Sequence, residues 1–283
     1  MNDLRLATAV IKAPMSRDQF FCGLLILAAA NGLVGRAVTN VVTVGWSEAL
    51  LGSFGISAMV PIACFAALRL LYRSGLREII TIPDALIGLV VFSMTILPAR
   101  FGWLALAVLS LYMLCVAPAQ SPRRRGALIA LAVTGPMLWG PTLMEVFGQP
   151  ILKADTILVS TLIGTDRVGN IFSSVIGSDG SHVNFAVGPD CSSLHGISIA
   201  ILAWITIINT VGSTWSARHL VWVLLAAVAV LAVNVSRLSL IGLLPAYYPA
   251  IHGSPGSEIA AWLSLALIVT ISLLGVGRES LRT

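Results

Sequence analysis

The sequence predicts an all-α polytopic membrane protein, with about eight transmembrane helices and a small extracytoplasmic β-hairpin before the sixth. Of its 283 residues, 57% are hydrophobic and only 10% are charged, whereas soluble domains carry roughly 25% charged residues. The mean hydropathy of +0.94 agrees with this class. Such a composition excludes a soluble cytosolic enzyme, a disordered chain and a small disulfide scaffold.

Eight apolar runs are candidates for helices that cross a bilayer, which takes about 20 residues each. They lie near residues 20–35, 51–72, 80–98, 101–119, 127–147, 196–212, 220–243 and 258–276. The first run is short and holds Asn31 and Gly32, but no small-residue cleavage site follows it, so a cleaved signal peptide is not expected. We expect residues 1–283 to form one integral membrane domain.

The distribution of basic residues predicts the orientation. If the N-terminus is inside, 12 of the 17 Lys and Arg residues fall on the cytoplasmic side, among them the run Arg123–Arg125. The other five are Arg36, Arg100, Lys153, Arg167 and Arg237. Because cytoplasmic loops retain Lys and Arg, this split places both termini in the cytoplasm.

Two segments interrupt the apolar pattern, and both are predicted to lie outside the cell. Segment 148–195 contains an amphipathic stretch at 151–165 and then two β-type runs, 170–176 and 182–187, around the turn sequence Gly177–Gly180. This pattern is typical of a β-hairpin. The second segment is the loop 245–257, which is rich in Pro, Gly and Tyr.

Cys191 differs from the other three cysteines by its position. Cys22, Cys64 and Cys115 lie in predicted spans, where a thiol behaves as a small apolar group. Cys191 lies in the outer segment 148–195, with no outside partner for a disulfide. A helix N-terminus just beyond it would lower the pKa of the thiol and favour the nucleophilic thiolate, while the neighbouring Asp190 works against this.

Arg237 and His252 are the other candidates for chemistry. Arg237 falls inside the apolar run 220–243, where a charged side chain is a functional candidate by default, although it could also snorkel to the head groups. Asn234 lies one turn earlier on the same helical face. His252 lies in the loop 245–257, and His195, one turn beyond Cys191, is a rival base.

The pattern Cys191-Ser192-Ser193-Leu194 before a span, Asn234-Val235-Ser236-Arg237 late in the next and His252-Gly253 beyond it resembles the exosortase/archaeosortase family. The resemblance covers residues 150–275. Family members commonly have Gly where this chain has Ser193, and a different lead-in where it has Gly188-Pro189-Asp190. These departures bear on the subfamily and on the tail motif it would recognise.

The resemblance implies a membrane cysteine protease or transpeptidase in a prokaryotic cytoplasmic membrane. It assigns Cys191 as the nucleophile, with Arg237 and His252 completing the triad, while Asn234 and His195 are candidates for substrate binding. The implied partners are exported proteins that end in a signature motif, a transmembrane helix and a basic cluster. A glycan or lipid acceptor for the cleaved protein is also implied.

Two other classes stay open on the sequence. One is a transporter in which Arg237 binds an anionic solute, and the other is a non-catalytic component of envelope polysaccharide assembly. A reactive, low-pKa thiol at Cys191 would favour the enzyme. We expect no metal site, no cofactor and no nucleic acid partner, because the sequence shows neither ligand spacing nor a phosphate-binding glycine loop.

Overall fold

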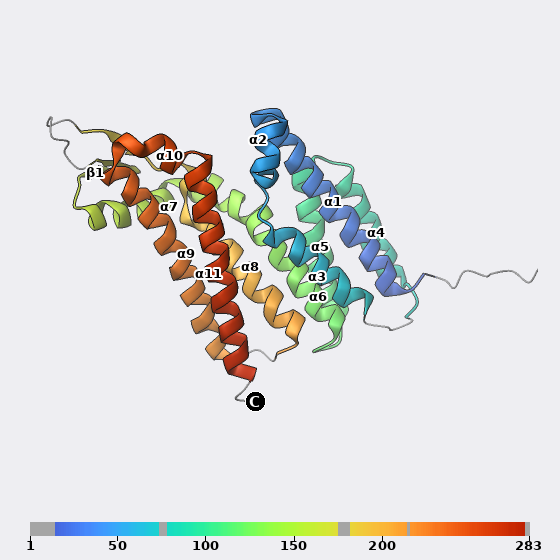
Figure 1. Ribbon diagram of the computed structural model, residues 1–283. Helices are drawn as coiled ribbons and strands as arrows, with labels where there is room; N and C mark the ends of the chain where they lie inside the picture. The colour runs from blue at the N-terminus through green and yellow to red at the C-terminus, as the bar shows by residue number, and fades with distance from the viewer. Residues whose placement is uncertain (1–14, 74–77, 175–181, 214–215, 281–283) are drawn as a thin grey trace, which may run out of the picture.

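The computed structural model describes residues 15–73, 78–174, 182–213 and 216–280, and it is mostly helical (Figure 1). The longer helices of its first half are α1 (Arg17–Val44), α3 (Met59–Tyr72), α4 (Ile82–Thr95), α5 (Ala99–Val116), α6 (Pro122–Thr134) and α7 (Gly140–Ile163). Those of its second half are α8 (Ser193–Val211), α9 (Ala217–Leu243) and α11 (Ser254–Ser280). The short helices are α2 (Trp46–Leu51), η1 (Ser53–Gly55), η2 (Gly135–Trp139), η3 (Pro189–Cys191), η4 (Pro245–Tyr247) and α10 (Tyr248–His252).

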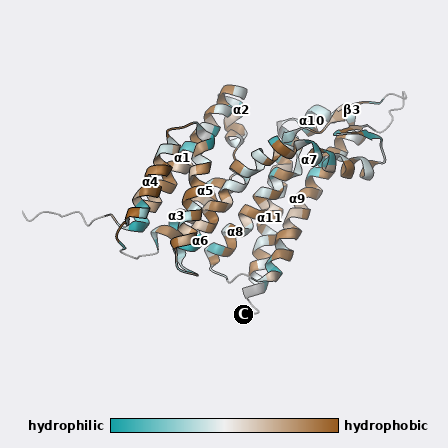
Figure 2. Cartoon of the chain, turned by 180° about the vertical axis from the view of Figure 1, so that it is seen from behind, coloured by the Kyte–Doolittle hydropathy of each residue, from teal (hydrophilic) through white to brown (hydrophobic). Residues whose placement is uncertain are grey.

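Five helical segments in the described part of the chain are long and apolar enough to cross a membrane, as expected of a multi-pass membrane protein. They are Arg17–Val44, Pro122–Ile163, Ser193–Val211, Ala217–Leu243 and Pro255–Arg278. Three shorter apolar helices, Met59–Tyr72, Ile82–Thr95 and Arg100–Val116, overlap the predicted spans 51–72, 80–98 and 101–119. Figure 2 shows hydrophobic residues along most of the length of these helices.

The predicted span 51–72 is not one continuous helix. Ser53 and Phe54 have positive φ angles of 50° and 56°, and the flanking Gly55 has a φ of 65°. Because a left-handed backbone cannot continue an α-helix, the chain turns here and α3 starts only at Met59. The first third of the predicted span therefore contains the last residue of α2, the short helix η1 and a connection to α3.

The amphipathic stretch predicted at 151–165 is not separate from the span at 127–147. α6, η2 and α7 run on from Pro122 to Ile163 as a single helical segment of 42 residues. A kink at Phe147, next to Pro150, bends it where the sequence turns from apolar to amphipathic. Proline lacks the amide hydrogen that the preceding turn needs, so this bend is expected there.

Buried ion pairs join the ends of the helices in the first half of the chain. Arg123 at the start of α6 is 1% exposed and donates to Asp18 on α1, at 2.6 Å, and to Glu78, at 2.8 Å. Arg17 donates to Glu78 and to Asp84 on α4. The guanidinium groups lower the pKa of Glu78, the Arg123 hydrogen bond being the main cause.

The sheet is larger than the predicted hairpin. Strands β2 (Ile171–Ser173) and β3 (Asn184–Ala186) pair antiparallel, with Phe172 opposite Phe185, and β1 (Arg167–Val168) adds a third strand beside β2. The predicted turn Gly177–Gly180 lies outside the described residues. The sheet and α10 lie at one end of the helical bundle, whereas α1 starts and α11 finishes at the opposite end (Figure 1).

Candidate active site

Cys191 ends the short helix η3, and α8 starts two residues later. Ser192 is the N-cap of α8, and its hydroxyl accepts a hydrogen bond from the amide of Leu194. Ser, with its short acceptor side chain, is one of the preferred N-cap residues. The Cys191 side chain is buried, at 7% exposure, so it projects into the protein rather than into solvent.

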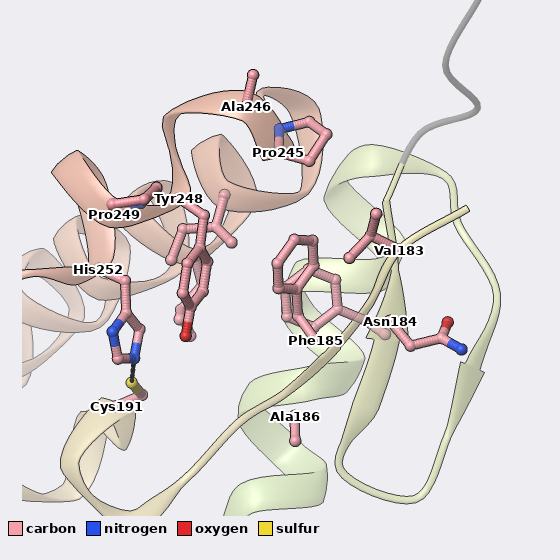
Figure 3. Close-up of a pocket in the computed structure, with 13 residues that line it drawn as sticks. Val183, Asn184, Phe185, Ala186, Cys191, Pro245, Ala246, Tyr248, Pro249 and His252 are labelled. Atoms are coloured by element: carbon pink, nitrogen blue, oxygen red, sulfur yellow. Dashed lines mark hydrogen bonds between the residues drawn. The ribbon is translucent and has the colours of Figure 1, made fainter. Parts of the chain in front are cut away.

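Cys191 and His252 meet although 61 residues separate them in the chain. The Sγ atom lies 3.5 Å from Nε2 of His252, within hydrogen-bonding distance for sulfur (Figure 3). α10 carries His252 across the end of the bundle to reach the thiol. This contact is the geometry that a nucleophile and its general base require.

Two interactions hold the imidazole of His252 in place. Its ring stacks on Tyr248, with centroids 4.8 Å apart and an angle of 15° between the planes. Tyr248 stacks in turn on Phe185 of β3, with centroids 5.3 Å apart. The second interaction is made by Arg237 on α9, whose Nη2 donates to the His252 carbonyl at 3.0 Å and whose Nε donates to the Ile251 carbonyl at 3.1 Å.

Asn234 and Asp155 hold the segment that carries the thiol. Nδ2 of Asn234 donates to the Cys191 carbonyl at 2.8 Å and to Oγ of Ser193 at 3.0 Å. The buried carboxylate of Asp155 on α7 accepts from the amide of Ser193 at 3.0 Å. Three helices, α7, α8 and α9, thus fix the backbone on either side of Cys191.

The structure brings together some of the candidate residues and separates others. Cys191, His252, Arg237 and Asn234 form one cluster. His252 is the imidazole that lies against the sulfur, whereas His195 lines another cavity, which it shares with Asn234 and Arg237 but not with Cys191 or His252. Asn234, proposed as a substrate ligand, uses both of its described hydrogen bonds on the protein backbone and the Ser193 hydroxyl.

The sequence left the pKa of Cys191 open between a helix N-terminus that would lower it and Asp190 that would raise it, and in the structure the pKa is raised. Burial is the main cause, and the charges of Asp190 and Asp155 act in the same direction. The Arg237 charge and the hydrogen bond with Gly188 oppose the rise without cancelling it. Burial therefore disfavours the thiolate form of Cys191.

Two cavities flank the cluster. The first, about 690 Å³, lies between β3 and α10, and Cys191 and His252 both line it (Figure 3). The second, about 430 Å³, lies among α8, α9, α11 and the segment 51–58, and it is lined by Asn234, Arg237 and His195. The thiol–imidazole pair and the arginine therefore face different spaces.

Sequence reasoning missed Asp155, Phe185 and Tyr248. Asp155 is an isolated carboxylate on the buried face of an amphipathic helix, beside Leu152 and Thr156, which is a signal that could have identified it. The aromatic stack of Phe185, Tyr248 and His252 joins segments more than 60 residues apart, so no local sequence pattern predicts it. In the described residues, no group of three or more His, Cys, Asp or Glu side chains could hold a metal ion.

Comparison with known proteins gives no independent guide to this site. The chain matches no protein-family model, and neither a curated protein nor a solved structure is detectably similar to it. The assignment of function therefore depends on the residues and their geometry.

Proposed function

We propose that this protein is a multi-pass membrane enzyme with eight spans, in which Cys191 attacks a peptide carbonyl and forms a thioester. The observation that carries this proposal is the 3.5 Å contact between Sγ of Cys191 and Nε2 of His252, at the wall of a cavity of about 690 Å³. A cavity of this size suits a peptide segment, since ligand pockets typically measure about 300–1,000 Å³.

The raised pKa of Cys191 determines how the attack would proceed. In the resting enzyme the thiol is protonated, so His252 acts as a general base and takes the proton as the S–C bond forms. The tetrahedral intermediate then collapses, the C–N bond breaks, and His252 gives the proton to the departing amine. Water or an acceptor amine attacks the thioester next and regenerates the thiol.

Arg237 serves this reaction in two ways. Its hydrogen bonds to the carbonyls of Ile251 and His252 hold the imidazole against the sulfur. Its positive charge also favours the negative charge that develops on the sulfur, because it opposes the rise in the pKa of Cys191. Arg237 is a positioning residue first, and its charge adds electrostatic stabilisation.

The proposed substrates are exported proteins that end in a signature motif, a hydrophobic helix and a basic cluster, as in the exosortase/archaeosortase family. A glycan or lipid amine is the proposed acceptor, with hydrolysis as the alternative fate of the thioester. The active site would face the extracytoplasmic side of a prokaryotic cytoplasmic membrane. The raised pKa of the thiol by itself favours the alternatives, a transporter for anions and a non-catalytic assembly component. The contact between Cys191 and His252 supports the enzyme, because a general base can activate a protonated thiol.

The test is tail processing in cells that express either of two cysteine variants. The substrate is a protein from the same genome with a short C-terminal motif, a hydrophobic helix and an Arg-rich tip. Cys191→Ala should abolish the mass shift of this protein on immunoblots, while both variants remain in the membrane fraction. Cys115→Ala is the matched control, because it removes an exposed thiol that is distant from Cys191 in the sequence. Unchanged processing by Cys191→Ala refutes the proposal.

A further inference from the structure

Among the residues that the structure describes, β3 is an edge strand, and some of its backbone groups have no strand partner. The amide of Val187 donates to the Asn170 carbonyl at 2.9 Å, and the amide of Ser174 donates to the Val183 carbonyl at 2.7 Å. Backbone groups alternate between the two sides of a strand. The amides and carbonyls of Asn184 and Ala186 therefore point away from β2, where no described strand pairs with them.

The first cavity runs along this edge of β3. Four consecutive residues, Val183 to Ala186, line it. Because consecutive side chains point to opposite faces of a sheet, a cavity that touches all four reaches the free edge of the strand, and it continues onto the face that carries Phe172 and Phe185. Its opposite wall is η4 and α10, and Figure 3 shows His252 and Cys191 at one end of this space.

An exposed strand edge beside an apolar wall binds a particular class of ligand, an extended peptide that adds a strand through main-chain hydrogen bonds. The apolar residues on the other walls include Phe172, Leu238, Ile241, Pro245 and Pro249. The cavity thus offers hydrogen bonds from one side and apolar contacts from the other, which is what an extended, weakly polar peptide needs. β3 points along the chain towards η3 and the thiol.

We infer that the peptide on the amino side of the scissile bond lies along β3 as a fourth strand, parallel to it, with its carbonyl at Cys191. This inference rests on the proposed function. The substrate's tail helix has to enter the bilayer, so the part after the scissile bond leads towards the bundle. The peptide before the scissile bond therefore occupies the cavity beside the sheet, at the end of the bundle.

A three-residue strand limits how much of the peptide is recognised. At about 3.3 Å per residue, β3 spans about 10 Å, enough for main-chain bonds to alternate peptide residues at Asn184 and Ala186. Main-chain bonds select the extended form and not a particular side chain, so this edge accepts many sequences. Side-chain selectivity would come from the apolar walls.

The experiment uses the full chain in lipid nanodiscs and an acetylated tetrapeptide chloromethyl ketone of Ala and Val residues as the probe. The Cys191 sulfur displaces chloride from this probe, so a thioether forms, the C–Cl bond breaks, and His252 takes the thiol proton. Two isomers of the probe carry one N-methyl group each, at neighbouring amides. In an added strand only every second amide donates to β3.

One isomer should alkylate Cys191 at least about 10-fold more slowly than the parent probe, and the other should match the parent, because one lost hydrogen bond in a buried site has about that effect. Ala186→Pro, which removes one outward amide, should slow the parent probe by a similar factor, while Ala186→Val should not. Equal rates for both isomers would overturn the inference. So would an unchanged rate for Ala186→Pro, provided that this variant unfolds at the same temperature as the wild type.

Iodoacetamide separates this inference from the proposed function. It is too small to use the strand edge, so its rate reports only the thiol and its base. If His252→Ala slows alkylation by iodoacetamide but the two methylated probes react equally, the Cys191–His252 pair stands and the peptide site falls. If His252→Ala leaves the iodoacetamide rate unchanged, His252 is not the general base. A difference in rate between the two N-methylated probes would still support the peptide site in that case.

Discussion

Arg237 on α9 donates a hydrogen bond to the backbone carbonyl of His252, with Nη2 and O 3.0 Å apart. A second bond from Nε reaches the neighbouring carbonyl of Ile251. A charged side chain within an apolar helix is thus used to fix a short helix at the end of the bundle. Its planar fork of donors suits two adjacent carbonyls better than the single ammonium of a lysine does.

Arg237→Lys should therefore slow processing although the positive charge is kept. Losing a charge-assisted hydrogen bond costs about 1.5–3 kcal/mol, which corresponds to roughly 10- to 100-fold in rate. The measurement is the time course of tail cleavage in nanodiscs. Arg100→Lys is the control, since Arg100 pairs with Glu145 on the surface, where its side chain is 76% exposed. Normal cleavage by Arg237→Lys would contradict the anchoring role.

The thiol of Cys191 should titrate above the usual range of a cysteine, because burial raises its pKa. Alkylation by iodoacetamide, followed by mass spectrometry as a function of pH, reports this value directly. Asp190→Asn removes a negative charge that disfavours the thiolate, so it should shift the rise in rate to lower pH. Arg237→Gln removes the favourable positive charge and should shift it to higher pH. Shifts in the same direction for both variants would contradict the assigned electrostatics.

Asp155→Ala should destabilise the segment around the thiol. The amide of Ser193 is buried and has the Asp155 carboxylate as its acceptor, and a buried donor that loses its partner costs about 1–3 kcal/mol. A lower midpoint of thermal unfolding in detergent checks this. Lys153→Ala on the exposed face of α7 is the control and should leave the midpoint unchanged. Equal midpoints of thermal unfolding for the two variants would contradict the capping role of Asp155.

The ion pairs around Glu78 should make the protein sensitive to acid. Arg123 lowers the pKa of Glu78, so this group stabilises the fold above its unfolded pKa of about 4.3. That stabilisation is lost as the pH falls through the lower folded value. Thermal unfolding between pH 6 and pH 3 should show the loss in the wild type, and Glu78→Gln should flatten this part of the profile.

Arg123→Met tests the same cluster at neutral pH. Removing one partner leaves the Asp18 carboxylate without its 2.6 Å bond to the guanidinium, and breaking a buried pair typically costs about 3–5 kcal/mol. The protein should unfold at a markedly lower temperature at pH 7. Arg124→Met, an exposed neighbour on the same helix, should have little effect, and equal losses for both would show that the helix, not the ion pair, was perturbed.

The amino-acid sequence by itself determined the helical membrane class, the positions of the five long apolar helices that the described residues contain and the strands that became β2 and β3. Each of these depends on local hydrophobicity and periodicity, which a linear pattern records. It also singled out Cys191, Arg237 and His252, because a thiol, a guanidinium and an imidazole were unusual in their segments. The break at Ser53 and Phe54 escaped it, since the run around them is apolar enough to read as one helix.

Only the tertiary structure decided how the polar groups meet. Nothing in the primary order brings His252 rather than His195 to the sulfur, since that depends on where α10 crosses the end of the bundle. The direction of the Cys191 pKa shift was also largely a tertiary matter, because burial is its main cause and Asp155 and Arg237 act on the thiol from other helices. Solvent exclusion and contacts across helices control these properties, and neither can be read from neighbours along the chain.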